Sequence, residues 1–203
     1  MPRTSEQNQA IKDKRRARII KSAIRVFASY GYDQSAIDDI TKDANCSHGL
    51  FYHYFDNKAV ILEAIVDENI RGDDLLPPCR QALAEGGMKG VKTLLDYLNK
   101  AYPGTSVHVA TGYLAVTLSN IETLPKSLKK TAAEIDVQAT LRKLIGDAQK
   151  EKKAIAGEPS EIAQGIYNII LANFRNLLIN GKTASVVSSD VLYNMVLLGE
   201  RED

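Results

Sequence analysis

The chain has 203 residues, of which 44% are apolar and 25% are charged, and its formal net charge is +1. These are the values of an ordinary globular protein of one or two domains, and the small net charge by itself indicates no particular partner. Two cysteines are too few for a disulfide framework, so we expect a reducing, cytoplasmic environment.

The N-terminal segment, MPRTSEQNQAIKDKRRARII, is polar and then basic, unlike a signal peptide. Residues 1–58 carry ten Lys and Arg against seven Asp and Glu, and six of those ten lie between Arg3 and Arg18. A charge run of this kind is more often a solvated terminus than a binding element. The alternative is an arm that meets a polyanion such as nucleic acid, and the run alone does not decide between the two.

Apolar spacing predicts four helices in the first third of the chain. The first covers residues 14–30, with apolar residues along one stripe, and Gly31 ends it. Shorter helices follow over 36–44, 48–55 and 58–70. The caps and turn residues expected for these three helices are Ser35, Asn45, Ser47 and Asn57.

Beyond residue 72 the pattern stays helical, and Pro or Gly breaks separate longer amphipathic runs. Helices are expected near 79–85, 90–101, 106–122, 127–152, 160–180 and 186–198. No segment alternates convincingly at period two, so the predicted fold class is all-α. Polar residues interrupt the most apolar long segment, 162–179, so we expect no membrane span. The chain divides into an N-terminal domain, 1–58, and a larger helical domain, 59–203.

The segment 46–58, CSHGLFYHYFDNK, concentrates aromatic residues and holds two of the three histidines in the chain. As a helix it has two faces. One arc of about 140° holds His48, Gly49, Tyr52 and His53. The opposite arc holds Leu50, Phe51, Tyr54 and Phe55.

Three interpretations of this segment compete. A metal site is disfavoured because His48 and His53 are five residues apart, and helical ligand pairs are spaced by four. A purely structural role explains the Leu/Phe arc but leaves the Gly, His and Tyr arc without a reason. A helix-turn-helix over about 36–55 explains both arcs, because its second helix packs on the domain with one face and enters the major groove with the other.

A longer segment, FASYGYDQSAIDDITKDANCSHGLFYHYFDNKAVIL, follows the basic first helix. Together they closely resemble the N-terminal domain of TetR-family transcriptional regulators, over about residues 15–65. The residues that carry the resemblance include Phe27, Gly31, Tyr32, Ile40, Ser47, Gly49, Leu50, Phe51, Tyr52, Phe55 and Lys58. The rest of the chain is similar to that family only in its helical layout.

The resemblance implies a sequence-specific DNA-binding regulator, a homodimeric repressor that a small-molecule effector releases from a palindromic operator. The implied contacts to bases and phosphates come from Ser47, His48, Gly49, Tyr52, His53, Tyr54 and Lys58, with Arg15, Arg16 and Arg18 on phosphates. Tyr54 is ambiguous because its ring belongs to the inner arc. Asp38 stands where the family often has a basic or small polar residue. Asp38 and Asp39 together would repel phosphates, which puts direct DNA contacts from the second helix in doubt.

The last two predicted helices are the candidate dimer interface, because 160–180 is apolar around most of its circumference and has more than one side to bury. The candidate interface residues are Ile162, Ile166, Ile170, Phe174, Leu177, Val187, Val191, Met195 and Leu198. The alternative is that both helices lie at the centre of a monomer.

The middle helices would hold the effector. The candidate pocket residues are Tyr97, Tyr102, His108, Tyr113, Asn120, Tyr167 and Asn173, each of which is more often an ordinary core or surface residue. The alternative function is an all-α small-molecule-binding protein or enzyme without a DNA role. The sequence shows no catalytic constellation, so we expect no enzyme activity, no cofactor and no metal.

Overall fold

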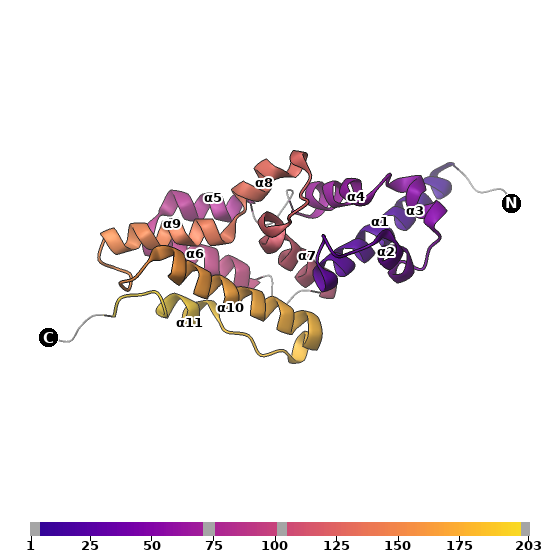
Figure 1. Ribbon diagram of the computed structural model, residues 1–203. Coiled ribbons are helices and arrows are strands. Elements are labelled where there is room, and N and C mark those ends of the chain that lie inside the picture. The colour runs from indigo at the N-terminus through magenta and orange to yellow at the C-terminus, as the bar shows by residue number, and fades with distance from the viewer. Residues whose placement is uncertain (1–4, 71–75, 101–104, 200–203) are drawn as a thin grey trace.

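The computed structural model describes residues 5–70, 76–100 and 105–199, and it confirms the all-α class (Figure 1). Within those ranges the only β-type pairing is one isolated bridge between Ala154 and Leu197. None of the helices in the described ranges combines the length and apolarity that crossing a membrane requires. The N-terminal elements are α1 (Ser5–Tyr30), α2 (Ile37–Asp43), α3 (His48–Tyr54), α4 (Lys58–Ile65) and a π-helical turn (Val66–Ile70).

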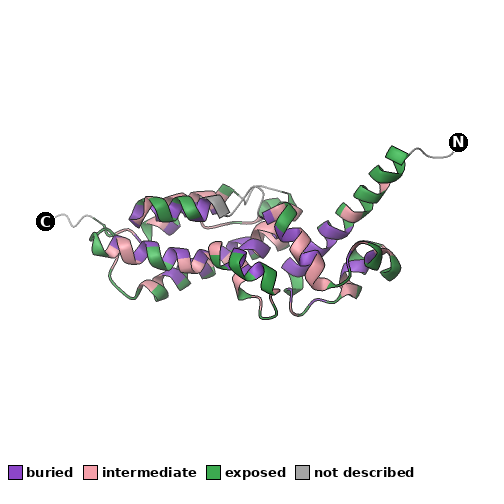
Figure 2. Ribbon diagram, turned by 90° about the horizontal axis from the view of Figure 1, so that it is seen from above, coloured by how far each residue is buried: buried purple, intermediate pink, exposed green. Residues whose placement is uncertain are grey.

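Helix α1 is longer than predicted, because it begins at Ser5 instead of residue 14. The added segment, SEQNQAIKD, contains no Gly or Pro to stop a helix and is rich in residues that tolerate one. Most of this first part of α1 is exposed, and Figure 2 shows it projecting away from the body of the protein. Lys12 in this part and Lys14, Arg15 and Arg18 directly after it are exposed to solvent.

Local signals set the short turns of the N-terminal domain. Gly31 (φ +82°) ends α1 and Asn45 (φ +46°) makes the turn before α3, both in the left-handed region as expected. Ser47 and Asn57 cap α3 and α4 through their side-chain oxygens. The expected cap of α2 was wrong: the N-cap is Ala36, whose amide donates to the Asp39 carboxylate at 2.9 Å, as in the second half of a capping box.

The C-terminal part begins with α5 (Leu76–Glu85), α6 (Gly87–Lys100) and α7 (Ser106–Thr117). It continues with α8 (Lys129–Glu134), α9 (Val137–Lys150), α10 (Pro159–Asn180) and α11 (Ser189–Asn194). Short 3-10 turns cover Leu118–Asn120, Lys126–Leu128 and Gly181–Thr183.

Two predicted helices differ from the structure. The run 127–152 breaks after α8, because the Asp136 carboxylate caps α9 by accepting from the Ala139 amide at 2.9 Å. The last helix is only six residues long instead of covering 186–198. The chain after it bonds to a neighbouring segment: the Ile155 amide donates to the Val196 carbonyl, and the Leu198 amide donates to the Lys153 carbonyl.

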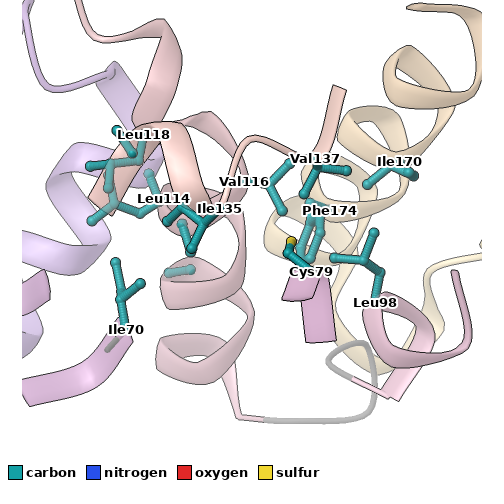
Figure 3. Packing of buried hydrophobic residues seen from close by; sticks show 14 of the residues in the cluster. Ile70, Cys79, Leu98, Leu114, Val116, Leu118, Ile135, Val137, Ile170 and Phe174 are labelled. Carbon is teal, nitrogen blue, oxygen red and sulfur yellow. The ribbon is translucent and has the colours of Figure 1, made fainter. Parts of the chain in front are cut away.

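Helix α7 joins the two halves of the core, because it packs on α1 and also on α10 (Figure 1). In Figure 3, Leu114 lies on the side of α7 where Ile70 is found, and Val116 lies toward Ile170 and Phe174. All five side chains are essentially buried, at 2% exposure or less. The N-terminal helices thus share one continuous apolar core with the C-terminal part.

Candidate nucleic-acid interface

Helix α3 separates its residues into a buried face and an exposed face. Phe51 is 0% exposed and Phe55, directly after the helix, is 2% exposed. The opposite arc, which consists of His48, Gly49, Tyr52 and His53, is exposed to solvent. Burial therefore follows the two arcs expected from the sequence, and the exposed arc is available for contact with a partner.

Ser47, the N-cap of α3, and Tyr54, its last residue, have structural roles. The Ser47 hydroxyl accepts from the Leu50 amide at 3.2 Å, so it stabilises the start of the helix. Tyr54 is half-buried and packs against the core, and its ring meets the His53 ring edge-on at 4.9 Å. Its ring thus belongs to the supporting side of the helix.

The helix-turn-helix is held rigidly on α1. The Cys46 amide donates to the Thr41 carbonyl at 3.0 Å and closes the turn between α2 and α3. At the end of α2, Asp43 forms an ion pair with Arg25 of α1. These contacts fix the direction in which α3 projects from the domain.

His48 lies beside the first turn of α2. Its Nε2 atom is 3.5 Å from Asp38 Oδ1 and 3.5 Å from Thr41 Oγ1. Both distances are long for hydrogen bonds, so the imidazole is oriented but not locked. Asp38 is 81% exposed and lies next to the exposed arc, where its charge opposes a close phosphate.

The three arginines predicted to contact phosphates differ in their surroundings. Arg15 and Arg18 are exposed on α1, and neither forms an ion pair with the part of the chain that the structure describes. Arg16 departs from its predicted role. Its guanidinium makes a bidentate pair with Glu68, at 2.8 and 2.5 Å, and lies 5.4 Å from the centre of the Phe55 ring. Arg16 is thus engaged in tying α1 to the π-helical turn.

Lys58 also departs from its predicted role at a phosphate. Its ammonium donates to the carbonyls of Tyr32 (2.7 Å), Ser35 (2.9 Å) and Asp33 (3.3 Å). It also lies 4.5 Å from the centre of the Tyr32 ring. A lysine has three N–H donors, and here all three serve the turn between α1 and α2. The residue is a structural clamp within the N-terminal domain.

Replacing Lys58 with methionine is therefore expected to destabilise the protein. Three carbonyls lose a charged donor while the apolar stem of the side chain stays, and we expect a loss of about 2 kcal/mol in the free energy of unfolding. Urea denaturation followed by circular dichroism measures it. Lys42→Met, on the exposed face of α2, is the matched control and should change stability little. Equal stability of the two variants would contradict the clamp.

Asp33, in the same turn, connects the N-terminal domain to the C-terminal one. Its carboxylate accepts from the amides of Glu122 (3.0 Å) and Thr123 (3.1 Å) and from the Thr123 hydroxyl (2.5 Å). Partial burial acts to raise the pKa of Asp33, but these hydrogen bonds and nearby Lys58 outweigh it, so the pKa lies below its ordinary value. The contact thus stabilises the fold above the ordinary carboxyl pKa and is lost as the pH falls through the lowered one.

A cavity of about 200 Å³ lies between the π-helical turn, α6 and α7. Of the predicted effector residues, Tyr97 and His108 line it, and Tyr102 lies outside the described residues. Two other lining residues, Asn69 and Lys100, were not predicted and carry no sequence pattern that marks them. They stand at the ends of separate helical elements, and only the fold brings them together.

The other predicted effector residues have structural partners. Burial raises the pKa of Tyr167 to about 12, and its hydroxyl donates to the Val116 carbonyl at 3.0 Å and accepts from Asn120 at 2.9 Å. The Asn173 amide bonds the backbone of Val187 in both directions, at 2.8 and 2.9 Å. These side chains do not line the cavity. Tyr113 and Asn120 border a separate open groove between α1 and α7.

The candidate dimer residues divide by burial. Ile166, Ile170 and Phe174 are 3%, 0% and 0% exposed, so they belong to the core of their own chain and cannot form an outer surface. Ile162, Leu177 and Val187 are half-buried. The exposed members are Val191 (51%), Met195 (49%) and Leu198 (46%), on and after α11. These three lie on α11 or directly after it, and α11 packs on α6.

Comparison by sequence matches a much shorter part of the chain than comparison by structure does. The family model for "Bacterial regulatory proteins, tetR family" matches residues 19–65. The "HTH-type transcriptional repressor KstR2" of Rhodococcus jostii is 36% identical over 77 residues, which are 37% of this chain and 36% of that protein. The "A-factor receptor protein" of Streptomyces griseus is 40% identical over 50 residues, 25% of this chain and 18% of that one. The chain thus spans well under half the length of these curated relatives.

Solved structures match nearly the whole chain. A mutant of HlyIIR superposes with a TM-score of 0.66 at 14% identity, covering 98% of this chain and all of that one. A TetR-family regulator from Bordetella parapertussis 12822 gives 0.57 at 24% identity, with 88% and 90% covered. The SmeT–triclosan complex gives 0.56 at 14% identity, with 92% and 93% covered. At these identities the likeness establishes the fold.

Proposed function

Since the chain belongs to the TetR family of bacterial regulatory proteins, we propose that it is a homodimeric repressor, released from a near-palindromic DNA operator by a small molecule. Family membership makes it a transcriptional regulator and not an enzyme. Several relatives, including KstR2 and the IcaR proteins of Staphylococcus, are themselves described as repressors or negative regulators. Those descriptions support repression as the mode of action.

The exposed arc of α3 carries the proposal. It presents His48, Tyr52 and His53 around a glycine, on a helix that is anchored by its other face. Imidazole and phenol groups can bond base edges in the major groove, and Gly49 lets the backbone come close to the DNA. Arg15 and Arg18 on α1 would contact phosphates and position the domain without reading sequence.

One such domain offers few base contacts, so tight binding requires two copies on a two-fold site. The exposed apolar residues Val191, Met195 and Leu198 support a dimer through α11 and the segment directly after it. The cavity beside α6 and α7 would receive the effector. The solved complex of the structural neighbour SmeT contains triclosan, and this supports small-molecule control of the present fold.

Gly49→Ala and Tyr52→Ala test the DNA proposal. A Cβ at Gly49 would meet no atom closer than Ser47 Oγ at 4.0 Å, so this variant should fold as well as the original. If the backbone at residue 49 approaches DNA, the added methyl group should lower affinity by about tenfold. Tyr52→Ala should cost about 1–3 kcal/mol of binding to the preferred sequence.

The measurement is fluorescence anisotropy on DNA selected by the protein from a random pool, at two salt concentrations because phosphate contacts are salt-dependent. Tyr30→Ala is the matched control, since Tyr30 is 65% exposed but lies at the far end of α1 from the arginines. If no sequence were selected, or if all three variants bound equally well, the proposed DNA interface would be wrong.

A further inference from the structure

The size of the cavity between the π-helical turn, α6 and α7 limits what it can hold. Its volume is about 200 Å³. An engineered protein cavity of about 150 Å³ holds one benzene molecule, whereas sites for drug-sized ligands span about 300–1,000 Å³. The present cavity therefore suits a body the size of one aromatic ring with a small substituent.

The inner wall of the cavity is apolar. Ile70, Leu98, Ala115 and Phe174 are each at most 3% exposed and supply aliphatic and aromatic surface. Gly112 on α7 adds no side chain and leaves room beside them. A ring or short branched chain would replace water against this wall, which favours binding in proportion to the apolar area removed from water.

The polar part of the wall contains no acidic side chain among the described residues. Lys100 and His108 line the cavity, and no described aspartate or glutamate does so. Lys100 makes no ion pair within the described part of the chain. Its charge acts on Asp96, one turn earlier on α6, but that carboxylate bonds the Lys92 ammonium at 2.8 Å. Lys100 is exposed at the end of α6 and borders the cavity.

A second hollow adjoins the cavity and shares Asn69, His108 and Thr111 with it. Glu68 borders this hollow, together with Lys21 and His108, but both carboxylate oxygens of Glu68 are bonded to Arg16. The cavity wall also includes Asn69 and Thr111. The Asn69 amide donates one N–H to the Ile65 carbonyl at 3.4 Å and keeps a second N–H for a ligand oxygen, whereas the Thr111 hydroxyl donates to the Val107 carbonyl at 2.9 Å.

We propose that the cavity binds a small monocarboxylate, with its carboxylate at Lys100 and His108 and a body of about one aromatic ring against Phe174. The proposal rests on the proposed function only in making this molecule the effector; the binding itself does not depend on DNA. Few residues connect the cavity to the N-terminal helices, because Asn69 and Ile70 line the cavity and the adjacent Glu68 pairs with Arg16 of α1.

The experiment is isothermal titration calorimetry of the full chain without DNA, using sodium benzoate, benzamide and naphthalene-2-carboxylate. We expect benzoate to bind at least about tenfold more tightly than benzamide, its neutral analogue of the same shape. The two-ring acid should bind more weakly than benzoate, because the cavity has no room for its second ring.

Lys100→Met should lower benzoate affinity at least about tenfold and leave benzamide affinity unchanged. Lys89→Met, an exposed position on the same helix and outside the cavity, is the matched control. Benzamide binding as tightly as benzoate, no benzoate binding at millimolar concentration, or equal benzoate affinity in the Lys100 variant would each overturn the proposal.

Adding benzoate to the protein–DNA complex separates the two proposals. Benzoate binding that follows the expected pattern, in a protein that selects no DNA, would support the ligand class and refute the regulator. DNA binding by a protein that ignores benzoate would refute the ligand class alone.

Discussion

Gly90→Ala is expected to destabilise the protein strongly, by about 3 kcal/mol, although alanine is the better helix former. A Cβ built at Gly90 on α6 would lie 2.3 Å from the Ala82 carbonyl oxygen of α5 and 2.6 Å from Leu144 Cδ2 of α9. The leucine can rotate, but the carbonyl is backbone. It also accepts from the Gly86 amide at 2.9 Å, so displacing it disturbs the end of α5.

The size of that effect follows from the balance of two terms. The intrinsic preference of a helix for alanine over glycine is worth about 1 kcal/mol. Forcing a methyl group into a closed contact usually costs about 1–3 kcal/mol, and more when the backbone has to move. Since the clash at 2.3 Å is with backbone, the helices must separate and the cost exceeds the gain.

Gly165→Ala on α10 is the matched control, because a Cβ there would meet no atom within 4 Å. This variant should gain about 0.5–1 kcal/mol from the lower entropy of its unfolded chain and better helix propensity. Calorimetric melting temperatures at one fixed protein concentration compare the two, because assembly makes the melting temperature depend on concentration. A Gly90→Ala protein that melts at or above the original temperature would show that α5 and α6 are not packed this closely.

The second large effect is expected for Val191→Glu, which should convert the proposed dimer into a monomer. Val191 is 51% exposed on α11, and burying an unpaired carboxylate in an apolar interface costs several kcal/mol. Operator affinity should then fall by about a hundredfold or more, since each domain binds its half-site alone. Sedimentation velocity measures the assembly, and anisotropy on the operator measures binding.

The folded monomer should tolerate this substitution. Ser188 caps α11 and its hydroxyl accepts from the residue 191 amide. A glutamate three residues after a serine cap completes a capping box, so the helix itself is not weakened. Leu83→Glu on α5 is the matched control, because Leu83 is also an exposed apolar residue (36%) but lies on a different helix from Val191. A Val191→Glu protein that sediments as a dimer would place the interface elsewhere.

The parts of the fold that the sequence predicted are those that depend on local interactions. The α3 faces, the Ser47 and Asn57 caps, and the left-handed Asn45 each depend on residues within a few positions along the chain. The contacts that Lys58 and Arg16 make within the chain were not predicted, because their partners are 23 to 52 residues away. The sequence alone does not distinguish a basic side chain that binds a phosphate from one that binds a carbonyl or carboxylate of its own chain.

The C-terminal part was less predictable for a related reason. Periodicity identified α10 as apolar on most sides, but it could not tell which side its own chain covers, so Ile166, Ile170 and Phe174 were placed in the interface although they are core. Of the residues that line the cavity, only Tyr97 and His108 were predicted, because much of its wall is formed where helix ends meet. Its charged residue, Lys100, is the last residue of α6 and has no pattern to distinguish it.

The turn between α1 and α2 has a bearing on how such proteins can evolve. Lys58 holds it from the N-terminal side and the backbone at 122–123 holds it, through Asp33, from the C-terminal side. A recombination event that joined this DNA-reading segment to a foreign regulatory domain would leave the Asp33 carboxylate facing whatever loop the new domain supplied. Exchange of the two parts is therefore constrained at this acidic residue as well as at the apolar contact between α1 and α7.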